Sequence, residues 1–481
     1  MQQRVLNLVR DRAFIDGAWV GTPTAPVRNK ATGETITNVP EMGAAETRAA
    51  IEAAHRALSG WSGKLAKERS AIIRRWYELI MANADELALL LTKEQGKPLA
   101  EAKGEIVYGA GFVEFYAEEA KRIYGETIPS PKGDARIVVI KQPIGVVAAI
   151  TPWNFPNAMI TRKVTPALAA GCTAVVKPAE DTPLSALALA ALAEEAGIPK
   201  GVLNVVTATN PAPVGEELTS NPLVRMVTFT GSTEVGKLLM SQAAKTVKRV
   251  GLELGGNAPF IVFDDADIDE AVEGALASKF RNTGQTCVCA NRFFVQSGVY
   301  DAFAEKLAVE VAKLKVGDGT EPGVTQGPLI NAAAVVKVEE HIADALTKGA
   351  KAIIGGKRDA KGGTFFEPTI LTGVTPDMLV AREETIGPVA PLFKFNDEAD
   401  VIAQANATQF GLASYFYARD IGRVWRVAEA LEFGIIGINE GVISTEVAPF
   451  GGIKESGLGR EGSRHGIEEF LEMKYIMMGG L

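Results

Sequence analysis

The chain has 481 residues, a length that predicts roughly two to four domains and a large buried core. Hydrophobic residues make up 47% and charged residues 22%, which is typical of a soluble globular enzyme and argues against a disordered chain. The net charge of −8 argues against a nucleic-acid partner, because phosphate binding needs a clustered excess of Lys and Arg. A local pair of arginines could still bind a small anion.

Cysteine and histidine usage excludes two further classes. The three cysteines, Cys172, Cys287 and Cys289, cannot form a disulfide framework. The Cys-x-Cys pair is one residue short of a zinc knuckle and the histidines are scattered, so we expect no metal site. No signal peptide is visible, and no stretch approaches roughly 18 uninterrupted apolar residues. We therefore expect a cytoplasmic protein without a membrane partner.

The first third of the chain changes character twice. Residues 11–40 predict short strands with Gly and Pro turns. Residues 44–124 carry apolar side chains at a spacing of three and four, which predicts helices. Residues 125–142 then predict two extended pieces joined by a Lys-Gly-Asp turn. An exposed strand edge invites pairing, so this hairpin is a candidate oligomerisation arm.

The rest of the chain alternates strands and helices in two sets. Residues 144–255 contain apolar strands separated by helices, which predicts a doubly wound parallel sheet. Residues 257–440 repeat the alternation and predict a second α/β domain. The C-terminal residues KYIMMGGL predict one more strand, which could complete the sheet begun by the arm. In a doubly wound fold, ligands bind at the carboxyl ends of the strands.

A reactive cysteine is the main candidate for chemistry. Residues 280–292, FRNTGQTCVCANR, follow a helical stretch that breaks at Asn282, Thr283 and Gly284. Cys287 comes directly afterwards among small and β-branched residues, so backbone N–H groups could approach it and stabilise a thiolate. A buried, unreactive thiol is the alternative, since free cysteines often pack as small hydrophobes.

Two strand ends carry groups suited to that chemistry. Asn154, in TPWNFP, could donate its side-chain N–H to a developing oxyanion, although a turn Asn between prolines is an equal interpretation. Glu253 precedes two glycines, and partial desolvation there would raise its pKa toward that of a general base. A surface position is the alternative for Glu253.

Two other strand ends suggest a nucleotide. Lys177 and Glu180 could bind ribose hydroxyls, and an acidic residue there would repel a 2′-phosphate, although a solvated charge pair is the alternative. Ser232, in TGSTEVG, could cap a helix whose N–H groups point at a phosphate. This is not a G-x-G-x-x-G fingerprint, so alone it indicates a dinucleotide only weakly.

Seven motifs occur in the order and spacing of the NAD(P)-dependent aldehyde dehydrogenase superfamily, and together they cover roughly residues 11–480. The chain resembles that superfamily, and ITRKVTPALAAG and SKFRNTGQTCVCANR are similar to succinate-semialdehyde dehydrogenases in particular. The motifs are TPWNFP, KPAEDTP, FTGS, LELGG, FRNTGQTCVC, EETIGP and PFGGIKESGLGREG.

The resemblance implies a role for each site residue. Cys287 would be the nucleophile, Glu253 the general base, and Asn154 with the Cys287 N–H the oxyanion hole. Substrate carboxylate binding would fall to Arg162, Arg281 and Ser444, although each arginine could instead be a helix-surface charge. The cofactor site would comprise Thr151, Trp153, Asn154, Lys177, Ala179, Glu180, Gly215, Thr230, Gly231, Ser232, Leu254 and Glu384.

The resemblance also implies an activity and an organisation. We expect oxidation of succinate semialdehyde to succinate through a cysteine thiohemiacetal and thioester, with NAD or NADP; Glu180 favours NAD. Glutarate semialdehyde or a broader range of aldehydes is the alternative. A cofactor-free thioesterase and an inactive homologue are different classes, and the presence of the strand-end residues and of Cys287, Glu253 and Asn154 disfavours them.

We expect an aldehyde-dehydrogenase-like fold with a Rossmann-like cofactor domain (residues 1–122 and 144–252) and a catalytic domain (253–440). The arm and tail (123–143 and 441–481) would form a small oligomerisation element of a dimer or tetramer. Two details stand apart. The family usually has Phe where this chain has Ile386, and Cys289 lies close enough in sequence to Cys287 for a strained, reversible disulfide.

Overall fold

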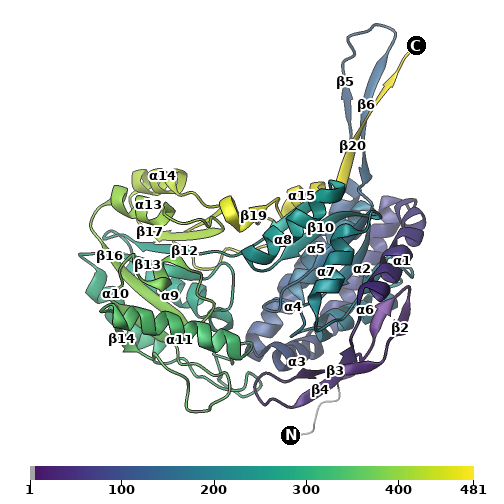
Figure 1. The fold of residues 1–481 in the computed structure, drawn as a ribbon. Coiled ribbons are helices and arrows are strands. Elements are labelled where there is room, and N and C mark those ends of the chain that lie inside the picture. Colours follow the sequence, from purple (N-terminus) through teal and green to yellow (C-terminus); the bar gives the residue numbers. More distant parts are fainter. Residues whose placement is uncertain (1–5) are drawn as a thin grey trace.

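A computed structural model describes residues 6–481. The protein has two lobes, each built on a mostly parallel sheet, and an arm of three strands that projects from one of them (Figure 1). The predicted class, a doubly wound domain with a second α/β domain and a small β element, is confirmed.

The first sheet has eight strands in the order β19-β11-β10-β7-β8-β9-β1-β2. The five central strands are parallel, and the short apolar runs of β7 and β8 are buried throughout. Both edges are antiparallel, which the sequence pattern did not reveal. The strands are β1 (Ala13–Ile15), β2 (Ala18–Val20), β7 (Val146–Ile150), β8 (Thr173–Lys177), β9 (Leu203–Val205), β10 (Val224–Thr230), β11 (Arg249–Glu253) and β19 (Gly457–Leu458).

Helices cover both faces of this sheet. Val147 and Ala149 of β7 join a core shared with α2, α4, α5 and α6, whereas Val146 and Ala148 join a second core with α1, α7 and α8. This alternation follows from the two-residue period of a strand. The helices are α1 (Ala44–Ser62), α2 (Ala66–Ala82), α3 (Ala84–Gln95), α4 (Leu99–Glu119), η1 (Ala120–Arg122), α5 (Ala158–Ala170), α6 (Leu184–Ala196), α7 (Pro211–Ser220), α8 (Thr233–Ala243) and η2 (Ala244–Thr246).

The second sheet has seven strands in the order β14-β15-β16-β13-β12-β17-β18, parallel except for β14. Phe260 and Val262 face a core with α9 and α10, and Ile261 and Phe263 face the core under α11, α13 and α14. The elements are β12 (Ala258–Val262), α9 (Ile268–Lys279), η3 (Arg281–Gly284), β13 (Ala290–Gln296), α10 (Tyr300–Val311), α11 (Ala332–Thr347), β14 (Lys351–Ile354), β15 (Thr369–Thr372), α12 (Leu379–Arg382), β16 (Val389–Phe395), α13 (Glu398–Asn406), β17 (Ala413–Tyr417), α14 (Ile421–Ala430) and β18 (Ile435–Ile438).

The arm is an antiparallel sheet in the order β20-β6-β5, so the C-terminal strand completes the predicted hairpin. A separate hairpin, β3-β4, lies near the N-terminus (Figure 1). No helix within residues 6–481 is long and apolar enough to cross a membrane. The remaining elements are β3 (Pro23–Arg28), β4 (Thr35–Pro40), β5 (Glu126–Ile128), β6 (Arg136–Pro143), η4 (Lys454–Ser456), α15 (Ser463–Gly466), η5 (Ile467–Phe470) and β20 (Leu471–Met478).

The chain passes between the two sheets at residues 254–257 and returns at residues 439–456. Buried Ser456 joins the two passages, because its hydroxyl donates to the Gly255 carbonyl at 2.7 Å and its carbonyl accepts the Leu254 N–H at 2.9 Å. Of the predicted tail, residues Gly457–Leu458 therefore pair with β11 in the first sheet, and Leu471–Met478 pair in the arm.

Candidate active site

The loop that carries Cys287 is held in an unusual backbone conformation. Helix α9 ends at Lys279, and Asn282 and Thr283 inside η3 have φ values of 50° and 57°. A β-branched residue in this left-handed region is strained, and such strain persists only where neighbours fix it. The Thr283 hydroxyl donates to the Gly327 carbonyl at 3.1 Å, and Gln285 bonds the Asn282 carbonyl at 3.1 Å. The predicted break in the helix is therefore a rigid turn.

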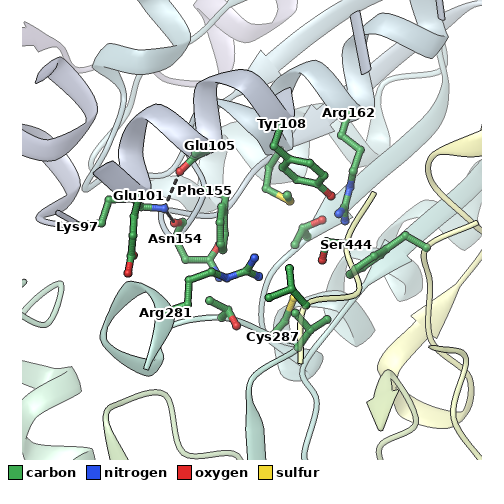
Figure 2. Close-up of a pocket in the computed structure, with 17 residues that line it drawn as sticks. Lys97, Glu101, Glu105, Tyr108, Asn154, Phe155, Arg162, Arg281, Cys287 and Ser444 are labelled. Atoms are coloured by element: carbon green, nitrogen blue, oxygen red, sulfur yellow. Dashed lines mark hydrogen bonds and ion pairs between the residues drawn. The ribbon is translucent and has the colours of Figure 1, made fainter. Parts of the chain in front are cut away.

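Cys287 is half-buried and lines a cavity of about 290 Å³ between the two lobes. Five other predicted site residues line the same cavity: Asn154, Arg162, Thr230, Arg281 and Ser444. Figure 2 shows the two arginine side chains entering it from different elements, near the Cys287 thiol. The complete lining is Lys97, Glu101, Gly104, Glu105, Tyr108, Asn154, Phe155, Met159, Arg162, Thr230, Arg281, Thr286, Cys287, Val288, Val442, Ser444 and Phe450.

The surroundings of the Cys287 thiol disfavour its ionised form. Burial raises the pKa of Cys287 to about 12; the Arg162 charge opposes this shift, and Glu253 and Glu384 add to it. Desolvation disfavours the thiolate and a nearby cation favours it, so the stabilisation of a thiolate by this loop stays a prediction.

Glu253 ends β11 and is 2% exposed, and neither of its carboxylate oxygens has a hydrogen-bond partner among the described residues. Burial, and then the nearby Glu461 carboxylate, raise its pKa well above the usual range, against the opposing charges of Arg162 and Lys163. The expected direction of the shift is confirmed. Glu253 does not line the Cys287 cavity; it borders a separate cavity of about 10 Å³, which Glu461 also lines.

The two arginines differ in their partners. Arg162 lies on α5, is 2% exposed, and ion-pairs through Nε with Glu461, while its Nη2 has no hydrogen-bond partner in the part of the chain that the structure describes. The alternative of a helix-surface charge is therefore wrong for Arg162. Arg281 makes no ion pair within the described part of the chain, and its guanidinium lies 5.4 Å from the Phe155 ring centroid. Both can still donate hydrogen bonds to an anion.

The carboxyl ends of β7, β8, β10 and β11 lie in register along one edge of the first sheet, with Ile150 beside Lys177 and Thr230 beside Glu253. The hydroxyls of Thr151 and Thr230 are buried there, and neither has a hydrogen-bond partner within residues 6–481. Unsatisfied buried groups at this edge suit a polar ligand such as a dinucleotide. The residues present therefore fit the cofactor expected at this edge.

Other predicted cofactor residues lie on the same strand ends or face them. Lys177 ion-pairs with Glu180, and Ser232 caps α8 by accepting the Val235 N–H at 3.3 Å. Glu384 accepts the Gly256 N–H at 3.0 Å, and burial raises its pKa to about 7. None of the remaining predicted cofactor residues lines the Cys287 cavity; these are Trp153, Ala179, Gly215, Gly231 and Leu254.

Cys289 points away from the cavity. Its sulfur accepts the Thr286 hydroxyl at 2.9 Å and lies 3.6 Å from the Lys279 carbonyl, and the residue is 1% exposed. A disulfide with Cys287 would require one thiol to leave these surroundings, so it stays a prediction. The described residues contain no group of three or more His, Cys, Asp or Glu placed to hold a metal.

Sequence reasoning missed one whole wall of the cavity. Lys97, Glu101, Glu105 and Tyr108 line it from α4 and the turn before it. Glu101, Glu105 and Tyr108 are spaced by four and three residues on α4 and so share one helical face, which was the available signal. Charges at this spacing usually mark a solvated face, so the pattern did not suggest a site. Glu461, in the GREG motif, was also unassigned.

The fold and the pocket together define a class of protein: cysteine-dependent oxidoreductases that use a dinucleotide. Residues 19–476 match the aldehyde dehydrogenase family, and the chain belongs to this family. It is thus an NAD(P)-dependent aldehyde dehydrogenase.

Three similar proteins sharpen the comparison. The chain is 66% identical to a glutarate-semialdehyde dehydrogenase of Pseudomonas aeruginosa, with 100% of each chain covered. It is also 66% identical to an NADP-dependent succinate-semialdehyde dehydrogenase of Escherichia coli, with 98% of each covered. The crystal structure of a succinate-semialdehyde dehydrogenase from Burkholderia pseudomallei is 64% identical, with 100% of each chain covered and a TM-score of 0.98.

Proposed function

We propose that this enzyme oxidises a short aldehyde that carries a carboxylate at its far end, with succinate semialdehyde as substrate and succinate as product. The observation that carries the proposal is that two arginines line the same cavity as Cys287. Arg162 is buried and pairs with Glu461, and Arg281 has no ion pair among the described residues. A guanidinium matches a carboxylate with parallel hydrogen bonds. Glutarate semialdehyde is the second candidate, because one methylene changes binding by only about 1–3 kcal/mol and a relative with that name is equally similar.

The residues of the chain divide the chemistry between them. Cys287 transfers its thiol proton to water, and its sulfur adds to the aldehyde carbon, giving a thiohemiacetal whose oxyanion accepts a hydrogen bond from the Asn154 amide. NAD(P)+, when held at the strand ends of the first sheet, would supply the hydride acceptor, and a thioester would then remain on Cys287. Glu253 then removes a proton from water as the water adds to the thioester carbon. Collapse of that adduct releases the carboxylic acid and the Cys287 sulfur.

The environment of Glu253 fits the last step. A general base works best when its pKa lies near the working pH, and burial moves this carboxyl upward from its usual range. Glu253 lies outside the cavity of Cys287, so its side chain must move from its place beside Glu461 to act there. Because it does not contact the thiol in this structure, we assign Glu253 to deacylation rather than to the first attack.

For the cofactor, NAD is the preferred form in this proposal. Glu180 lies at the end of β8 with a partly exposed side chain, and it already neutralises Lys177. A 2′-phosphate at this strand end would meet a carboxylate and would lose a free ammonium partner. For assembly, we propose a homo-oligomer, dimer or tetramer, that pairs through the arm, since seven of the eight residues of β20 are exposed.

A substrate panel tests the proposal. Steady-state rates are measured for semialdehydes of three to six carbons and for propanal and butanal, each with NAD and with NADP. We expect the highest kcat/KM with succinate semialdehyde and NAD. Equal values for butanal and succinate semialdehyde would rule out the arginine pair. The Cys287→Ser variant should produce no reduced nucleotide, and ester hydrolysis without any nucleotide binding would instead favour the thioesterase class.

A further inference from the structure

A buried ion pair lies behind the proposed oxyanion hole. Lys97, in the turn between α3 and α4, is 2% exposed, and its Nζ lies 2.5 Å from Glu105 Oε2. The ammonium also lies 3.9 Å from the Phe155 ring centroid. Burying two charges is costly, so such a pair is weak grounds for stability and calls for another reason.

The third contact of the ammonium supplies that reason. Lys97 Nζ donates to the backbone carbonyl of Asn154 at 2.8 Å, and the Asn282 side-chain N–H donates to the same oxygen at 3.1 Å. Asn282 lies five residues before Cys287 in the strained turn. One carbonyl oxygen thus links the residue that holds the oxyanion to the loop that holds the nucleophile.

Further bonds from the same wall fix both partners of this link. The Asn282 N–H donates to Glu101 at 2.7 Å, and its side-chain oxygen accepts from Gln95 at 3.1 Å. The other oxygen of Glu105 accepts the N–H groups of Asn157 and Ala158 at 2.9 and 3.2 Å. Those residues begin α5, so Glu105 fixes the chain on the far side of Asn154 as well. Figure 2 shows Lys97 between Glu105 and Asn154.

We propose that Lys97 is a positioning residue that fixes the Asn154 amide relative to the Cys287 sulfur. The inference rests on the proposed function of these two residues. Lys97 acts through the Asn154 carbonyl and Glu105, and its charge keeps both acceptors in place at once. An oxyanion donor must be preorganised at the right distance, and a shift of about 1 Å can cost roughly 10²-fold in rate.

The test separates oxyanion chemistry from general damage. In Lys97→Met, acylation of Cys287 by p-nitrophenyl acetate and kcat for the semialdehyde should both fall by about 10²-fold, because each passes through an oxyanion. Alkylation of Cys287 by iodoacetamide forms no oxyanion, so its rate should match that of the wild type, as should the Kd for NAD measured by protein fluorescence. Lys97→Arg, which keeps the charge, should recover part of the lost acylation rate.

The control is Lys103→Met, which removes an exposed ion pair with Asp85 from the same helix and should leave all four measurements unchanged. Unchanged acylation in Lys97→Met would overturn the proposal, and so would a parallel fall in alkylation. If Lys97→Met does not fold, Asn282→Ala, which removes the second donor to the same carbonyl, must show the same selective loss of acylation. If the wild-type enzyme did not oxidise semialdehydes, the proposed function would be wrong. The proposal for Lys97 would still be tested, because the ester and alkylation assays need no semialdehyde.

Discussion

Arg281 offers the cleanest probe of substrate recognition. Replacing Arg162 would also strip Glu461 of an ion-pair partner beside Glu253, so its effects would mix binding with base chemistry. Arg281 has no ion pair among the described residues; its guanidinium lies near Phe155 and attracts the Glu101 carboxylate. Its loss should therefore act mainly on the contact with the substrate carboxylate.

The expected magnitude follows from that contact. A hydrogen bond to a charged group contributes about 1.5–3 kcal/mol, and about 1.4 kcal/mol corresponds to a factor of ten. In Arg281→Met, kcat/KM for succinate semialdehyde should fall by about 10-fold to 150-fold. The value for butanal should change far less, because butanal has the same chain length and no carboxylate.

The assay follows the appearance of reduced nucleotide by its absorbance, with both aldehydes run on each variant. Arg281→Lys should lose less than Arg281→Met because it keeps the charge without the planar fork. Arg75→Met, a replacement of an exposed arginine on α2, is the matched control and should behave as the wild type. An equal loss for butanal and the semialdehyde in Arg281→Met would refute the role in recognition.

Three further outcomes are expected. Glu180→Ala should raise the ratio of kcat/KM for NADP over NAD by about tenfold by freeing Lys177; an unchanged ratio would contradict the role of this carboxylate. Peroxide inactivation should be reversed by dithiothreitol in the wild type but not in Cys289→Ala, and identical recovery in both would exclude the disulfide. Burial raises the pKa of Glu94 from 4.5 to about 7, so the folded state binds its proton more tightly and loses about 3 kcal/mol as pH rises from below 4.5 to above 7. Glu94→Gln, compared with the wild type by urea unfolding, should therefore be relatively more stable at about pH 8 than at about pH 5; equal differences at both pH values would refute this.

Periodicity was enough to predict most of the fold. The apolar runs of β7 and β8 and the spacing on α1 to α4 are local patterns, and the sheet follows from them. The pairing of β19 with β11 was not predictable. A strand of two residues is too short to show an alternating pattern, and the contact joins positions about 200 residues apart in sequence. The antiparallel edge formed by β1 and β2 depends likewise on a long-range contact.

For the site, the sequence motifs predicted which residues would take part, and only the structure shows which of them lie next to one another. Asn154, Arg162, Arg281 and Ser444 meet around Cys287, and their roles remain predictions. The direction of the Cys287 pKa shift could not be foreseen, since it depends on burial and on charged groups that are distant in sequence, such as Arg162 and Glu253.

Lys97 was overlooked for a related reason. A charged residue in a turn beside a charged helix is usually solvated, and only the packed structure shows that Lys97 is enclosed.

Ser456 has a mechanical consequence. The two covalent passages between the sheets are bonded together at this residue, so they act as a single pivot rather than as two separate tethers. Other bonds also join the lobes: the Leu99 N–H meets the Gly319 carbonyl at 3.0 Å, Asn331 meets Asp181 at 3.3 Å, and Asn282 bonds Gln95, Glu101 and Asn154. A separation of the two lobes would have to break these bonds as well as those of Ser456.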